Sequence, residues 1–166
     1  MPFFKRKSSQ QIKSYCEGIQ LAELYSLNQR YDALFHKLDG EETQNKKKME
    51  AFKKQINEII VQIDKQAQAI NEYERYRQNV LDNLPGNAAE RYLVLQSVSY
   101  PVTDNRASLE AELNQLNTRK DKLVLRNAWI GTEKRACLQE LKIINEVIEE
   151  KELDAQSRLE HSGSVR

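Results

Sequence analysis

The chain has few of the residues on which catalytic, metal-binding and disulfide-stabilised proteins depend. It contains two cysteines, two histidines, five glycines and three prolines among 166 residues. Two cysteines are too few for a disulfide framework, and His36 and His161 have no Cys or carboxylate neighbours at metal-ligand spacing. The glycines are scattered, so no phosphate-binding glycine loop is present. We therefore expect a protein that is not an enzyme and has no catalytic residue, metal or cofactor.

Long hydrophobic runs and a large charge of one sign are also lacking. No apolar run approaches the roughly 20 residues of a membrane-spanning helix, and the first residues lack the apolar core of a secretory signal. The net charge of +1 argues against a general attraction to nucleic acid or to an anionic membrane. The basic cluster comprises Lys46, Lys47, Lys48, Lys53 and Lys54, and the one aromatic residue among them, Phe52, belongs to the hydrophobic repeat described below, so base stacking there is not expected. We expect a cytosolic protein that binds no nucleic acid and inserts into no membrane.

What the chain does have is a hydrophobic repeat of alternating three and four residues. In its first stretch the repeat comprises Met49, Phe52, Ile56, Ile59, Ile63, Ile70, Tyr73, Val80 and Leu84. In its second stretch it comprises Leu109, Leu113, Leu116, Leu123, Ile130, Cys137, Leu141, Ile144 and Ile148. An average spacing of 3.5 residues predicts helices that supercoil around a partner helix. The predicted fold is all-α, a long antiparallel two-helix coiled-coil hairpin with a proline-containing connector.

Turn residues, capping residues and changes in composition predict that the chain has five segments. They are a basic flexible start at 1–9, a first long helix at 10–84, a connector at 85–108, a return helix at 109–160 and a flexible tail at 161–166. Pro85 stops the first helix, because proline disfavours helix in the residue before it. Asp104, Asn105 or Ser108 is placed to cap the return helix. Inside the connector, residues 88–96 suit a short helix, whereas 92–100 are rich enough in Val and Tyr to form a strand.

The repeat is interrupted in two places. Between Leu38 and Met49 it lapses into polar residues and changes register, which predicts either a stutter in a continuous helix or a break at Asp39 and Gly40. In the return helix three consecutive core positions are polar, namely Lys120, Asn127 and Lys134. Polar core residues lower stability but select a register or a partner.

If the helices fold back directly around the connector, Leu84 lies near Leu109 and Cys137 faces the neighbourhood of Ile56. The thiols of Cys16 and Cys137 are then far apart. Cys137 falls in the apolar stripe, where a free cysteine acts as a small buried apolar residue.

In that register a return helix of about 50 residues covers the first helix only as far as about Leu34. The N-terminal segment therefore has few partners within the chain. We expect a partner-binding stripe there that consists of Leu21, Leu24, Tyr25, Leu27, Tyr31, Leu34 and Phe35. Such a stripe must self-associate, fold back at Gly40 or dock on another protein, and docking is the interpretation that we favour.

The sequence of the connector and of the start of the return helix carries a family resemblance. Residues 89–98 read AERYLVLQSV, and residues 108–123 read SLEAELNQLNTRKDKL. In order and spacing these stretches are similar to the corresponding region of stalk proteins from invasion-type secretion systems. With its two long helices, the chain resembles the central stalk proteins of bacterial type III export systems, the flagellar FliJ and YscO-type family.

This resemblance implies a non-enzymatic rod with three kinds of partner: a hexameric export ATPase, the cytoplasmic ring of the export gate, and secretion chaperones. It implies a cytoplasmic protein at the periphery of a membrane-embedded secretion apparatus. By position, the ATPase end comprises the first helix up to Leu38, which includes the stripe, and the last helix from Ile144. The tip at the gate comprises the connector, with Arg91, Tyr92 and Tyr100 as contacts.

Two other classes of protein share this layout. A coiled-coil tether or oligomeric scaffold explains the same features without an ATPase partner. A prefoldin-like chaperone also joins two helices by an extended segment, but one Val- and Tyr-rich run is too little for its hairpins.

Overall fold

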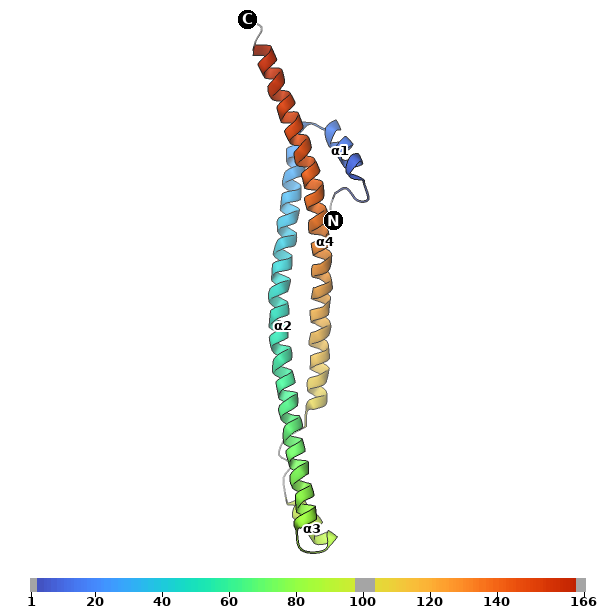
Figure 1. The fold of residues 1–166 in the computed structure, drawn as a ribbon, viewed down its shortest axis with the longest axis vertical. Helices are drawn as coiled ribbons and strands as arrows, with labels where there is room; N and C mark the ends of the chain where they lie inside the picture. The colour runs from blue at the N-terminus through green and yellow to red at the C-terminus, as the bar shows by residue number, and fades with distance from the viewer. Residues whose placement is uncertain (1–2, 98–103, 164–166) are drawn as a thin grey trace. The chain divides into compact units, whose positions relative to one another are not determined.

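A computed structural model describes residues 3–97 and 104–163 of the chain, and these residues form four α-helices (Figure 1). The helices are α1 (Ser9–Gly18), α2 (Leu21–Asn83), α3 (Ala88–Gln96) and α4 (Arg106–Gly163). No strand occurs within these ranges, which confirms the all-α prediction. The chain divides into two compact units, of which unit 1 contains Met1–Lys47 and Leu123–Arg166 and unit 2 contains Lys48–Lys122.

The first long helix is not continuous from residue 10, so this part of the prediction is wrong. α1 begins with a capping box between Ser8 and Gln11 and ends at Gly18, after which Ile19 is extended. Lys151 of α4 donates hydrogen bonds from Nζ to the carbonyl oxygen of Glu17, at 2.9 Å, and to that of Ile19. The ammonium group therefore satisfies carbonyl oxygens that the end of a helix leaves without an intrahelical partner.

α2 is continuous through the polar lapse, so the alternative of a break at Asp39 and Gly40 is wrong. Helical geometry runs without interruption from Leu21 to Asn83. Glycine lowers helix stability by about 1 kcal/mol relative to alanine. The helix persists here because side chains on both sides of Gly40, those of Asp39 and Glu42, bind Lys134 of α4.

α4 is longer at both ends than the predicted 109–160. The amide of Leu109 donates to the carbonyl oxygen of Asn105 at 3.1 Å, and the Asp104 carboxylate accepts from the amide of Arg106 at 3.2 Å. Ser108 therefore lies inside the helix instead of capping it. At the other end, residues 161–163, predicted to be a flexible tail, continue the helix to Gly163.

In unit 1, the start of α2 packs against α4 in the opposite direction, and α1 packs beside them (Figure 1). The buried cluster consists of Phe4, Ile12, Cys16, Leu24, Tyr31, Leu38, Ile130, Cys137, Ile144, Val147 and Ile148. Full burial of a side chain such as leucine contributes about 1.5–3 kcal/mol. The expectation that the segment around Leu24 and Tyr31 has few partners within the chain is therefore wrong.

The error came from the pairing register. In unit 2, the side chain of Gln66 binds Asn105, so α4 begins opposite Gln66 and not beside the end of α2. In unit 1, Cys137 lies between Lys134, which binds Asp39, and Glu140, which binds Tyr31. Cys137 thus faces the segment 31–39 and not Ile56, although it is buried and free as expected.

Unit 2 holds a smaller apolar cluster and a short helix. The cluster comprises Ile56, Ile59, Leu109 and Leu116, with Phe52, Ile63 and Leu113 packed against it. Residues 88–96 form the helix α3, so the strand predicted as an alternative for 92–100 is wrong where the structure describes it; residues 98–100 lie outside the described ranges. A capping box between Asn87 and Glu90 starts α3. Gly86 precedes it with a φ of 118°, a backbone conformation that residues with a Cβ rarely adopt, so this turn favours glycine.

Candidate functional site

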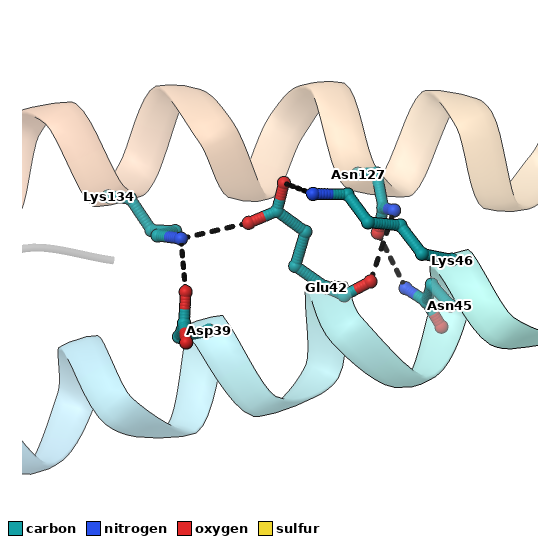
Figure 2. Close-up of polar contacts among 6 residues, drawn as sticks. All are labelled: Asp39, Glu42, Asn45, Lys46, Asn127 and Lys134. Atoms are coloured by element: carbon teal, nitrogen blue, oxygen red, sulfur yellow. Dashed lines mark hydrogen bonds and ion pairs between the residues drawn. The ribbon is translucent and has the colours of Figure 1, made fainter.

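Several of the polar residues that interrupt the repeat form a cluster between α2 and α4 in unit 1, which we call the polar layer and of which Figure 2 shows the central part. It comprises Asp39, Glu41, Glu42 and Asn45 of α2 and Arg126, Asn127 and Lys134 of α4. At its centre, the amide nitrogen of Asn45 donates to the amide oxygen of Asn127 at 2.9 Å. The Asn127 nitrogen donates in turn to the Glu42 carbonyl oxygen at 3.4 Å. Asn45 is only 5% exposed, so these hydrogen bonds replace water that the amide has lost.

Lys134 anchors one end of the polar layer. Its Nζ lies 2.5 Å from an Asp39 carboxylate oxygen and 2.8 Å from a Glu42 oxygen, and Glu42 also accepts from Lys46 at 3.0 Å (Figure 2). These hydrogen bonds raise the pKa of Lys134 and lower the pKa of Glu42, because each favours the charged form of its partner. Both groups are therefore charged at neutral pH.

A second ion pair belongs to the polar layer. Arg126 binds both carboxylate oxygens of Glu41, with its Nε at 2.7 Å and its Nη2 at 2.9 Å. Two parallel hydrogen bonds of this kind fix the orientation of the guanidinium plane. The hydrogen bond to Arg126 lowers the pKa of Glu41. The same guanidinium lies over the ring of Trp129, 4.3 Å from its centroid.

The polar groups at the two interruptions of the repeat are therefore hydrogen-bond partners of each other. The lapse on α2 supplies the carboxylates and the amide, and two of the three polar core positions on α4, Asn127 and Lys134, supply donors to them. The third, Lys120, donates to Asn117 at 3.3 Å in its own helix. A slip of α4 by one heptad would keep apolar residues opposite apolar residues but would separate the polar partners. The polar layer thus selects the observed register.

α4 carries a second stripe, which the sequence reading missed. Its positions are spaced by alternating four and three residues: Trp129, Glu133, Ala136, Glu140, Ile143, Val147 and Glu150. Its C-terminal part faces α1, since Lys13 binds Glu150 at 3.1 Å and Ile12 and Cys16 share a cluster with Ile143 and Val147. The presence of Glu at three of the seven positions hid the pattern from a search for apolar residues. We call this set the second stripe.

The N-terminal arm, residues 3–8, covers Tyr31. The Tyr31 hydroxyl donates to the carboxylate of Glu140 and accepts from the amide of Phe3 at 3.1 Å. The Phe3 ring meets the Tyr31 ring edge to face at a centroid distance of 4.8 Å. Burial, together with the hydrogen bond to Glu140, strongly raises the pKa of the Tyr31 hydroxyl.

The predicted partner-binding stripe is mostly inside unit 1. Leu24 and Tyr31 are fully buried, and four further members pack against the core: Leu21, Leu27, Leu34 and Phe35. Tyr25, at 42% exposed, is the member that faces solvent, and its hydroxyl donates to Glu152. The stripe therefore presents one residue, not seven, to a partner.

At the tip, the predicted residues have different roles. The Arg91 guanidinium donates from Nη1 to the Leu81 carbonyl oxygen at 2.8 Å, where the positive charge suits the end of α2. Tyr92 is exposed together with Leu93 and Val94, so α3 presents an apolar surface. Tyr100 lies outside the described residues.

Within the residues that the structure describes, no group of three or more His, Cys, Asp or Glu side chains is arranged to hold a metal ion. None of the helices in the described ranges combines the length and the hydrophobicity needed to span a membrane. Comparisons with protein-family models, with curated proteins and with solved structures gave no match to this chain. The candidate sites therefore rest on the geometry of the chain itself.

Proposed function

We propose that this chain is a non-enzymatic coiled-coil stalk in bacterial type III protein secretion, which engages a hexameric export ATPase and links it to the export gate. The observation that supports it is the pairing of two long helices, α2 with 63 residues and α4 with 58, through a repeat interrupted by one matched polar layer. The stretches that carry the family resemblance fall on α3 and on the start of α4. In this proposal α2 and α4 are the two strands of an antiparallel coiled-coil hairpin.

The surface proposed for the ATPase follows from which residues of unit 1 are exposed. Leu24 and Tyr31 are excluded because they are buried. Leu153 and Leu159, near the end of α4, are 63% and 71% exposed, and Tyr25 lies close by because it binds Glu152. Exposed apolar side chains next to an aromatic residue are typical of binding surfaces. We therefore assign the ATPase contact to Tyr25, Leu153 and Leu159.

The surface proposed for the gate is on α3 in unit 2. Tyr92, Leu93 and Val94 are consecutive and exposed, while Leu95 is buried and fixes the orientation of the helix. Arg91 is occupied by the Leu81 carbonyl oxygen, so it positions α3 in this proposal. The gate contact is then the apolar face of α3.

The test is binding of the purified chain to the export ATPase hexamer of the same host, measured by analytical ultracentrifugation. A Leu153→Asp/Leu159→Asp variant should bind at least about tenfold more weakly, because charge in an apolar contact costs more than about 1.4 kcal/mol. The matched control is Val124→Asp/Leu125→Asp, which changes two exposed apolar residues elsewhere on α4. Equal binding by the two variants would reject the assigned surface, and no binding by the wild type would reject the stalk.

A structural tether or oligomeric scaffold without an ATPase partner is the second candidate. The exposure of Leu153 and Leu159 favours it if these residues pair with a second copy of the chain. A mass that rises with protein concentration, and that returns to the monomer value in the Leu153→Asp/Leu159→Asp variant, would support the scaffold over the stalk.

A further inference from the structure

The second stripe of α4 is covered over only part of its length. α1 lies along its C-terminal part, from Ile143 to Glu150, through the Lys13–Glu150 pair and the shared buried cluster. α1 begins at Ser9, and before it the N-terminal arm forms bends and a turn in which the amide of Lys7 donates to the Phe4 carbonyl oxygen at 3.4 Å. The stripe nevertheless continues towards the N-terminus of α4 as Glu140, Ala136, Glu133 and Trp129. This part of the stripe therefore lies beyond α1, and within it Glu133 and Glu140 are buried whereas Trp129 is 42% exposed.

A groove of about 650 Å³ lies between this part of α4 and the N-terminal arm. Its lining comprises Phe4, Lys5, Arg6, Trp129, Thr132, Glu133, Ala136 and Glu140, all in unit 1. Thr132 and Ala136, one helical turn apart on α4, contribute short side chains to this lining. The groove thus has a floor of short side chains and one exposed aromatic wall, Trp129, since the Phe4 ring is buried.

Trp129 is held in place before anything binds. The guanidinium of Arg126 lies over its ring, and Glu41 holds that guanidinium with two hydrogen bonds. Trp129 is still 42% exposed, although it is the single tryptophan of the chain. An ordered, partly exposed tryptophan costs little entropy on binding, which is the property of an interface anchor.

Among the charged residues that line the groove, the exposed ones are positive. Lys5 and Arg6 form one lip, and the chain has no acidic residue before Glu17. In α4, residues 122–145 contain two carboxylates, Glu133 and Glu140, which are 6% and 8% exposed. The surface that a partner meets is therefore apolar at the floor and cationic at the lip.

We propose that this groove binds an amphipathic α-helix of a partner protein, which lies on α4 in line with α1. The apolar face of that helix packs on Trp129, Thr132 and Ala136, as α1 packs on Ile143 and Val147. Acidic residues along its edge face Lys5 and Arg6. Two observations select this occupant: the groove continues an existing helix interface, and its lip is complementary to negative charge. The inference does not depend on the stalk function.

Trp129 provides the readout, because all tryptophan fluorescence of the chain comes from the wall of the groove. The probes are two synthetic peptides of about 16 residues, long enough for induced helix formation. Both carry leucines at alternating three- and four-residue spacing; one has Glu and the other has Lys at the remaining positions. We expect the Glu peptide to shift the emission to shorter wavelength and to protect it from acrylamide, and the Lys peptide to do neither.

Three variants test whether binding depends on the groove and not on the net charge of the chain. Lys5→Glu/Arg6→Glu should weaken the Glu peptide by about tenfold or more, as expected for two reversed exposed pairs. Lys47→Glu/Lys48→Glu changes the net charge by the same amount on exposed positions of α2 and should leave binding unchanged. Thr132→Arg fills the floor from an exposed position and should abolish binding while the far-UV circular dichroism stays the same.

Four results would overturn the proposal. They are equal binding of the two peptides, no binding of the Glu peptide to the wild type, full binding by Lys5→Glu/Arg6→Glu, or full binding by Thr132→Arg. If the tryptophan emission shifts with protein concentration in the absence of peptide, the groove is occupied by a second copy of the chain. A shift with phosphatidylglycerol vesicles but not with the Glu peptide would assign it to a membrane surface. Either of these also rejects the partner helix.

Discussion

The Asn45–Asn127 pair gives a test of the polar layer in which single and double substitutions should act in opposite directions. In the Asn127→Ala variant, the Asn45 amide stays buried and loses its acceptor. An unsatisfied buried polar group costs about 1–3 kcal/mol, so the free energy of unfolding should fall by that amount. In Asn45→Leu/Asn127→Leu, both amides are replaced by apolar groups, and stability should be equal to or above that of the wild type.

The assay is urea unfolding followed by far-UV circular dichroism, with the midpoint and the slope fitted for each variant. The matched control is Asn114→Ala, an exposed asparagine on α4, which should change the free energy of unfolding by less than about 0.5 kcal/mol. If Asn127→Ala also falls within that limit, or if the double leucine variant is less stable than the wild type, the polar layer does not act as we argue.

The double leucine variant should also lose its unique register. The pair Gln66→Cys/Asn105→Cys reports the observed register in unit 2, because these side chains are in contact. Tyr73→Cys/Asn105→Cys reports a slip of seven residues. In the wild-type background we expect disulfide formation only by the first pair, and in the Asn45→Leu/Asn127→Leu background by both. Crosslinking by the first pair alone in both backgrounds would show that other residues fix the register.

Three further predictions concern the core and its ionisable groups. Leu24→Ala should lower the free energy of unfolding by about 2–5 kcal/mol, since Leu24 is fully buried. The control Ala22→Gly, at an exposed position of the same helix, should lower it by about 1 kcal/mol. Equal losses in the two variants would contradict the assignment of Leu24 to the core. The lowered pKa of Glu42 means that its contribution to stability is present at neutral pH and is lost as the pH falls below about 4.3. Glu42→Gln should therefore flatten the acid limb when the free energy of unfolding is plotted against pH. An unchanged acid limb would refute the role of Glu42. The raised pKa of Tyr31 means that its contribution to the free energy of unfolding is present below the ordinary pKa of about 10 and is lost as the pH rises above it. Tyr31→Phe should therefore flatten the alkaline limb when the free energy of unfolding is plotted against pH. Absorbance titration should show Tyr31 ionising only on unfolding.

Local sequence signals predicted the helices of this chain well. The turn residues around Pro85 and Gly86 end α2 at Asn83, and α3 spans the predicted 88–96. These features depend on backbone preferences within a few residues, which can be read from the sequence. The break after α1 could not be read in this way, because the Lys151 ammonium that satisfies its carbonyl oxygens is 132 residues away from Ile19.

The pairing of the helices was predicted wrongly for a different physical reason. A repeat of seven residues is satisfied equally by registers that differ by seven, so the apolar positions alone cannot distinguish them. The residues that do distinguish them are polar, such as Asn45, Asn127 and Lys134. The polar core positions of the return helix were expected to select a register or a partner, but they were not matched to the polar lapse of the first helix. Matching the donors of one interruption to the acceptors of the other would have placed Leu24 and Tyr31 in the core.

The attachment of α1 through Lys151 has a consequence for how the molecule opens. Among the described residues, one side chain of α4 satisfies both Glu17 and Ile19, Lys13 binds Glu150, and Ile12 and Cys16 supply the apolar packing of this short helix. α1 should therefore detach as a cooperative unit of its own, with a free energy of opening lower than the free energy of global unfolding. In native-state hydrogen exchange the amides of α1 should exchange together and earlier than those of α2. Each such opening would expose the part of the second stripe that α1 covers, from Ile143 to Glu150. A partner helix bound in the groove could then extend onto these positions and compete with α1 for them.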